Sequence, residues 1–116
     1  MENKVVTGDL AMSESLKKGL EQGLVKSMRT IGKGENIHAV QFSGVVKDAK
    51  GEPFSHPNEQ ISVVTKGKVL MNIDGVETVL NAGDAIFIPS GAVHFGTTLE
   101  ESTIIDIFSP PREHLD

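Results

Sequence analysis

Short apolar stretches alternate with turn-forming residues along most of the chain, from Gly23 to Phe108. Each stretch has about the length of an ordinary β-strand, and Gly, Pro, Asn or Asp separates it from the next. This pattern is typical of an antiparallel sandwich or barrel. It predicts an all-β fold with strands at Leu24–Ile31, Ile37–Val46, Gln60–Thr65, Lys68–Ile73, Glu77–Leu80, Ala85–Ile88 and Ser102–Phe108.

Three groups of residues predict the sharpest corners of this fold. Asp74-Gly75 separates two apolar stretches, and both residue types accept the positive φ that a type I′ hairpin turn requires. Asn81–Asp84 and Pro89–Gly91 predict two further turns. Pro110-Pro111 removes two successive amide donors, so we expect the last strand to end there.

The first 22 residues follow a different pattern. Apolar side chains recur at every fourth position: Met12, Leu16, Leu20 and Leu24. This spacing indicates a short amphipathic helix, but Gly19 and Gly23 would each weaken a helix by about 1 kcal/mol relative to Ala. A loose arm, or a strand exchanged with a second subunit, is therefore an alternative. We expect an N-terminal arm over residues 1–22 and one domain over residues 23–116.

Composition narrows the classes of function. The 116 residues carry a formal net charge of -5, which provides no positive field for nucleic acid or an anionic membrane. Cysteine is absent, so a metal would need nitrogen or oxygen ligands, and a reducing compartment fits. The longest apolar run, Ala85–Ile88, is far shorter than the ~20 residues that span a bilayer. We expect a cytoplasmic protein that binds neither nucleic acid nor membranes.

Two segments about thirty residues apart contain the residues best suited to chemistry. An extended chain from residue 54 to residue 62 places four side chains on one face: Phe54, His56, Gln60 and Ser62. His94 follows the Pro89–Gly91 corner, where a rigid turn can direct an imidazole inward. These side chains can converge on one cavity.

A third cluster lies at the end of the chain. Asp106 shares a strand face with Ile104 and Phe108, so it points either into the barrel or toward solvent. A buried carboxylate needs a partner or a raised pKa, and both favour general acid or base chemistry. Arg112 follows the diproline and can either fold back to bind a carboxylate or lie in solvent.

The second segment resembles the cupin signature of Gly, five residues, Pro, one residue, Gly, two residues and His, which Gly83, Pro89, Gly91 and His94 match. The first cupin motif, which begins His-x-His, is matched by His56, Gln60 and Gly67, with Phe54 at the position of the first histidine. Thr98 stands where cupins usually carry Asn. The resemblance implies a cupin-type jelly-roll β-barrel of two antiparallel sheets.

The resemblance also implies a set of metal ligands: His56, Gln60 and His94. Such ligands hold Zn²⁺, Fe²⁺, Mn²⁺ or Ni²⁺ and leave positions open for a substrate. The neutral Gln60 is a weak donor, and the loss of a ligand at Phe54 should reduce metal affinity. The alternative is a metal-free pocket in which the two histidines form hydrogen bonds and Phe54 packs across the mouth.

The run from Asp106 through Phe108 to Arg112 is similar to that of small pectin-degradation cupins, which convert unsaturated uronates to their linear keto form. The resemblance implies that a metal polarises a small sugar acid and that Asp106 moves a proton. It also implies that Arg112 binds the carboxylate, that Phe108 excludes water, and that Phe54 and Ser62 contact the substrate.

Two other functions remain open at the level of sequence. The same pocket can serve a binding protein that holds a small molecule without transforming it. Iron-dependent oxygenase chemistry is a third hypothesis, but Gln60 replaces the carboxylate that such sites usually carry. Small cupins commonly pair, so we expect a homodimer.

Overall fold

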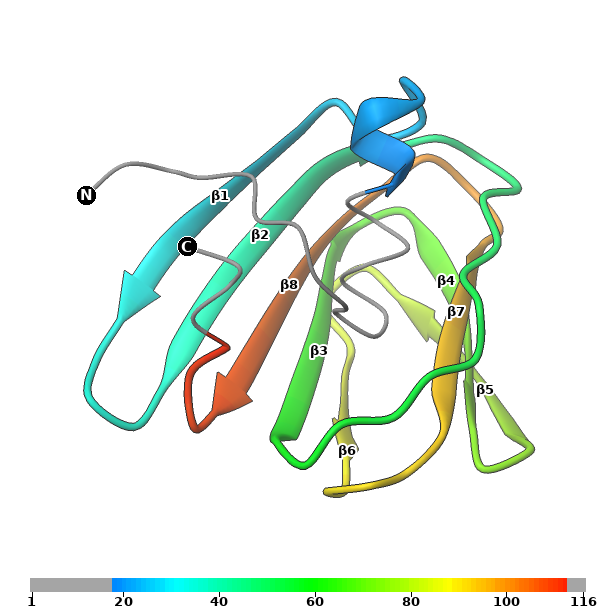
Figure 1. Cartoon of the computed structure of the whole chain (residues 1–116). Coiled ribbons are helices and arrows are strands. Elements are labelled where there is room, and N and C mark those ends of the chain that lie inside the picture. Colours follow the sequence, from blue (N-terminus) through cyan, green and yellow to red (C-terminus); the bar gives the residue numbers. More distant parts are fainter. Residues whose placement is uncertain (1–17, 113–116) are drawn as a thin grey trace.

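The computed structural model describes residues 18–112, which form two antiparallel sheets that face each other (Figure 1). The larger sheet has the strand order β1-β2-β8-β3-β6, and the smaller has the order β5-β4-β7. The strands are β1 (Ser27–Lys33), β2 (His38–Val45), β3 (Glu59–Lys66), β4 (Lys68–Ile73), β5 (Val76–Asn81), β6 (Ala85–Ile88), β7 (His94–Thr98) and β8 (Ser102–Ser109). Within residues 18–112, no helix combines the length and hydrophobicity needed to cross a bilayer.

The predicted all-β jelly roll is confirmed. Strands β4 and β6 have the predicted bounds, and β8 ends immediately before the diproline. Strand β7 was not predicted, because Phe95 is its one large apolar side chain. Its inward positions carry His94, Gly96 and Thr98 instead of the usual branched hydrophobics.

Alternation along β8 decides which way Asp106 points. Ser102, Ile104, Asp106 and Phe108 are buried, whereas the residues between them are only partly covered. The same alternation occurs in β2 and β3, because side chains two residues apart share a sheet face. Asp106 therefore points into the barrel and not to solvent.

Two glycines are required by the turns that they occupy. In the Asp74-Gly75 hairpin φ is 49° and 88°, as the predicted type I′ turn requires. Gly67 has a φ of 90°, and a Cβ there would collide with the carbonyl oxygen of Glu101 and with Oγ of Ser102. The glycine of the first cupin motif thus permits the close passage of β3 into β4.

The segment Lys47–Glu52, between β2 and β3, runs beside β7 as an added edge (Figure 1). The amide of Gly51 donates to the carbonyl oxygen of Gly96 at 2.8 Å. Thr98 donates from Oγ1 to the carbonyl oxygen of Val46 at 2.6 Å and accepts from the amide of Ala49 at 2.9 Å. Hydrogen bonds to β7 therefore tie this segment to the smaller sheet.

A single helical turn at residues 18–21 precedes β1. Figure 1 shows this turn at one end of the barrel, close to the ends of β2 and β8. Most of the predicted N-terminal arm and amphipathic helix lies outside the described residues.

Candidate functional site between the two sheets

His56 precedes β3 and is almost completely buried. Its Nδ1 lies 3.0 Å from the backbone carbonyl oxygen of Asn58, and its Nε2 lies 2.9 Å from Oε1 of Gln60. Both partners are carbonyl oxygens, which only accept, so the single hydrogen of the neutral ring can serve one of them. When this hydrogen is on Nδ1, the lone pair of Nε2 faces Oε1 of Gln60, an arrangement that a cation bound to both atoms stabilises.

His94 begins β7 and is fully buried beside His56. The two rings meet edge to face, with centroids 5.0 Å apart. Nδ1–H of His94 donates to the carbonyl oxygen of Ala92 at 3.0 Å, and its buried Nε2 has no hydrogen-bond partner among residues 18–112. His94 thus has the tautomer that leaves Nε2 available as a ligand, and His56 has the same one when its hydrogen is on Nδ1.

The electrostatic surroundings keep both imidazoles neutral. Burial, reinforced by the positive charge of Arg112, lowers the pKa of His56 to about 4. Burial is also the main cause that lowers the pKa of His94, and Arg112 acts in the same direction. Near neutral pH the two rings are therefore uncharged, the form in which an imidazole binds a metal.

A chain of hydrogen bonds runs from Gln60 to Asp106. Nε2 of Gln60 donates to Oγ of Ser62 at 2.9 Å, and the Ser62 hydroxyl donates to Oδ1 of Asp106 at 2.7 Å. Asp106 is fully buried, and its Oδ2 has no partner among the described residues. Burial raises the pKa of Asp106 to about 7, although the hydrogen bonds from Ser62 and Gln60 oppose this shift. A carboxyl group with this pKa can take up or release a proton near neutral pH.

Arg112 folds back against the barrel, as the carboxylate-binding hypothesis requires. It is 5% exposed, and its Nη1 donates to Oδ1 of Asn58 at 3.0 Å. Asn58 in turn donates from Nδ2 to the carbonyl oxygen of Pro110 at 2.6 Å. The guanidinium lies 5.7 Å from the ring centroid of Phe108, which itself packs edge to face with His56 at 5.8 Å. The alternative of a solvated arginine is wrong.

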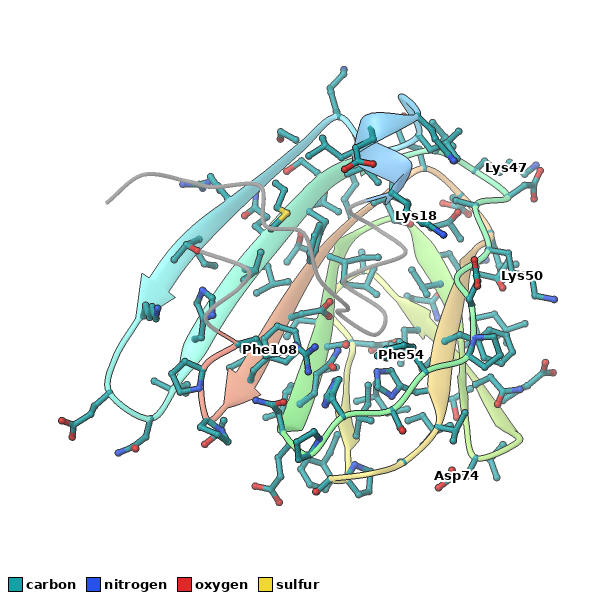
Figure 2. All side chains as sticks on the ribbon, in the orientation of Figure 1. Lys18, Lys47, Lys50, Phe54, Asp74 and Phe108 are labelled. Carbon is teal, nitrogen blue, oxygen red and sulfur yellow. The ribbon has the colours of Figure 1, made fainter. Side chains whose placement is uncertain are left out.

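Phe54 lies at the position of the missing histidine and is half-buried. Its amide donates to the carbonyl oxygen of His94 at 3.2 Å, and the amide of His94 donates back at 2.8 Å. Directly paired antiparallel residues project their side chains to the same side, so Phe54 accompanies His94. Figure 2 shows Phe54 on the segment beside β7 and Phe108 on the facing sheet.

Residues 43–108 match the cupin domain family. The chain is a cupin. The match covers both motif segments and all the strands from β3 to β7. Each candidate ligand therefore lies inside the part of the chain that defines the family.

The relatives of this cupin include proteins of pectin degradation. It is 38% identical over 68 residues to the pectin degradation protein KdgF of Dickeya dadantii (strain 3937). This match covers 57% of this chain and 62% of that one. The structure of an RmlC-like cupin from Shewanella frigidimarina NCIMB 400 superposes with a TM-score of 0.70 and 35% identity, covering 74% of this chain and 77% of that one. KdgF from Halomonas sp. gives a TM-score of 0.70 at 30% identity, covering 74% and 79% of the two chains. The resemblance to pectin-degradation cupins is thus confirmed.

The donors of this cupin fit a divalent cation. Two ligand atoms bound at 2.0–2.1 Å and at right angles lie about 2.9 Å apart, which is the distance from Nε2 of His56 to Oε1 of Gln60. The unpartnered Nε2 of His94 supplies a third donor. Residues 18–112 contain no group of three or more His, Cys, Asp or Glu placed to hold a metal, so a set of three donors formed with the two histidines requires the amide oxygen of Gln60. Three neutral donors leave the ionic charge uncompensated, which predicts weak binding.

The structure brings most of the predicted site residues together. The network of direct contacts joins His56, Gln60, Ser62, Asp106, Phe108 and Arg112, with His94 and Phe54 beside it. Sequence reasoning missed the role of Asn58, which joins His56 to Arg112. Its signal in the sequence was a polar side chain within the first motif, two residues before Gln60.

Proposed function

We propose that this cupin is an enzyme that isomerises a small sugar-acid-like molecule with the help of a divalent metal. The continuous path of contacts from His56 through Gln60 and Ser62 to the buried Asp106 carries the proposal. This path couples a candidate ligand set to a carboxyl group whose pKa suits proton transfer. The named relatives of pectin degradation support an unsaturated uronate as the substrate class.

The proposed reaction converts an enol to its keto form. The hydroxyl oxygen of the substrate loses a proton and the neighbouring carbon gains one, so no oxidant or reductant is needed. A divalent cation held by His56, Gln60 and His94 would polarise that oxygen. Asp106 holds and returns the proton, with the Ser62 hydroxyl fixed against it at 2.7 Å.

The remaining residues position the substrate in this proposal. Arg112 is the buried cation beside both imidazoles, and it would hold the carboxylate of a sugar acid. Asn58 fixes the guanidinium through its hydrogen bond. Phe108 walls off His56 from water, which strengthens the electrostatic interactions around it.

Phe54 favours a second candidate function. Its pairing with His94 places an aromatic ring where the family has a metal ligand. In this reading the cupin binds a small molecule without transforming it, and the histidines are only hydrogen-bonding groups. Glu59 does not rescue oxygenase chemistry, because its side chain is exposed on the outer face of β3.

Turnover separates the two functions. Untagged protein would be analysed for metal, reconstituted with Zn²⁺, Mn²⁺ or Ni²⁺, and assayed for loss of the absorbance of an unsaturated uronate. The enzyme proposal expects metal-stimulated conversion that is lost in Asp106→Asn. Binding of the uronate without conversion under every metal condition would favour the binding protein.

We also propose that this cupin forms a homodimer through the outer face of its larger sheet. One row of directly paired residues crosses four strands of this face and is entirely apolar: Ala39, Ile107, Ile61 and Phe87. Ile61 and Phe87 are 41% and 52% exposed. Glu59 borders this row on one side and Arg29 lies toward the other, so charged side chains flank the apolar row.

A further inference from the structure

A cavity of about 170 Å³ lies between the sheets, next to the helical turn at residues 18–21. Its inner wall is formed by side chains of β3, β4, β5 and β8: Ser62, Val64, Val69, Met71, Leu80 and Ile104. The candidate ligands His56, Gln60 and His94 do not line it. Ser62 is the residue that this cavity shares with the hydrogen-bonded path to Asp106.

The polar atoms of the inner wall are already bonded within the protein. Ser62 donates to Asp106 and accepts from Gln60. Thr98, which also lines the cavity, donates to the carbonyl oxygen of Val46 and accepts from the amide of Ala49. The wall therefore offers few hydrogen bonds to a hydroxylated sugar, and it holds water poorly.

The cavity has the size of a small ring. An apolar cavity of ~150 Å³ in another protein binds benzene, so this one has room for about six to eight non-hydrogen atoms. Gly96 helps to keep the space open. A Cβ at that position would lie 3.3 Å from Cγ1 of Val69 and 3.7 Å from Cε of Met71, two side chains of the wall.

Charged groups are confined to the mouth of the cavity. Lys18, Lys50 and Glu52 line it there, and Nζ of Lys18 lies 3.7 Å from a carboxylate oxygen of Glu52. Both side chains of this ion pair are more than half exposed. Figure 2 shows Lys18 at the helical turn and Lys50 on the segment that runs beside β7. A ligand would thus bury an apolar part and leave any polar part at the rim.

We propose that this cavity is a second binding compartment, which takes a compact apolar group such as an alicyclic or aromatic ring. It lies on the far side of Ser62 from the candidate metal ligands. Burial of a ring against Val64, Met71 and Leu80 removes apolar surface from water without breaking an existing hydrogen bond. The inference holds whether or not the protein turns over an unsaturated uronate.

Methyl NMR of the full chain tests the compartment directly, with cyclohexanol as the probe. Methionine methyl groups would be labelled with ¹³C, and Met28→Leu and Met71→Leu would assign the two reporter signals. We expect a saturable shift of the Met71 signal, because this residue lines the cavity. The Met28 signal on β1 should stay unchanged. No shift of Met71 up to the solubility limit of cyclohexanol would overturn the proposal.

Two variants make the test specific. Val64→Phe fills the inner wall, and Leu24→Trp covers the mouth from a residue that is 39% exposed and tolerates change more readily. Each should weaken cyclohexanol binding at least tenfold. Ile37→Trp, at a 53% exposed position outside the cavity, should bind as the unmodified protein does. Unchanged binding in folded Leu24→Trp and Val64→Phe would contradict the assignment. The readout requires neither metal nor turnover, so it is independent of the proposed reaction.

Discussion

The hydroxyl of Ser62 donates to Oδ1 of Asp106 at 2.7 Å, and the two residues are directly paired between β3 and β8. This pair places the carboxyl group inside the barrel behind Ser62, so Asp106 does not line the cavity itself. Ser62 contacts Asp106 directly and also lines that compartment. The relationship connects the two parts of the interior.

Asp106→Asn should lower turnover of an unsaturated uronate by at least 100-fold, because an amide of the same shape cannot carry the proton. The fold should persist, since the buried site favours an uncharged group. Steady-state kinetics with circular dichroism as the folding control checks this. A rate within threefold of the unmodified enzyme would remove Asp106 from the mechanism.

The metal-free protein should gain stability as the pH rises from about 4.5 to about 6.5. In this range the unfolded chain protonates His56 and His94, whose folded pKa values are lowered, whereas the folded chain protonates Asp106, whose pKa is raised. The unfolded state therefore binds about one more proton from these three groups, worth at most ~1.4 kcal/mol per pH unit.

In Asp106→Asn the folded chain no longer binds the proton that opposes those of the two histidines. The free energy of unfolding of this variant should therefore rise with pH about twice as steeply as that of the unmodified protein, as far as these groups determine it. Urea unfolding in EDTA at several pH values measures both slopes, and their difference isolates Asp106. A variant slope equal to or shallower than the unmodified one would contradict the raised pKa of this carboxyl.

Phe54→His should raise the affinity for Zn²⁺ or Ni²⁺ by at least tenfold, because it returns a ligand beside His94. Phe54→Leu, which shortens the apolar side chain without adding a donor, is the matched control and should bring no gain. Isothermal titration calorimetry measures both. Equal affinities in the two variants would show that residue 54 does not reach the metal.

Arg112→Lys should raise KM for a uronate about tenfold and change kcat less, because an ammonium lacks the planar fork of a guanidinium. The hydrogen bond to Asn58 would also be lost or distorted. Arg29→Lys, on the exposed β1, provides a control with the same change of side chain. A fall in kcat with KM unchanged would argue against carboxylate binding by Arg112.

Ile61→Lys should convert the homodimer into a monomer, because it places a charge in the apolar row beside Phe87. The dissociation constant of the dimer should rise at least 100-fold. Val76→Lys, at a 68% exposed position on β5 of the smaller sheet, should leave the dimer intact. Sedimentation velocity distinguishes the two. A monomeric unmodified protein would refute the proposed interface.

Much of the fold followed from alternation, whereas β7 did not. Hydrophobic periodicity detects a strand only when its inward positions are apolar. In β7 these positions carry a histidine, a glycine and a threonine: His94, Gly96 and Thr98. His94 is a candidate ligand, and Gly96 leaves space for the cavity. Thr98 forms hydrogen bonds with Val46 and Ala49.

Motif spacing located the candidate ligands but not their connections. The period of a strand left two directions open for Asp106, and only the pairing of β8 with β3 places it against Ser62. Likewise, Arg112 is held by Asn58, which lies 54 residues earlier in the chain. Such contacts depend on the tertiary fold, and no local pattern encodes them.

The central claim is that His56, Gln60 and His94 converge on one metal position. Anomalous diffraction from crystals soaked in Zn²⁺ tests it most directly. The account predicts one strong peak within bonding distance of Nε2 of His56, Oε1 of Gln60 and Nε2 of His94. A peak elsewhere, or His56 still facing Gln60 with no peak between the three donors at millimolar Zn²⁺, would contradict it.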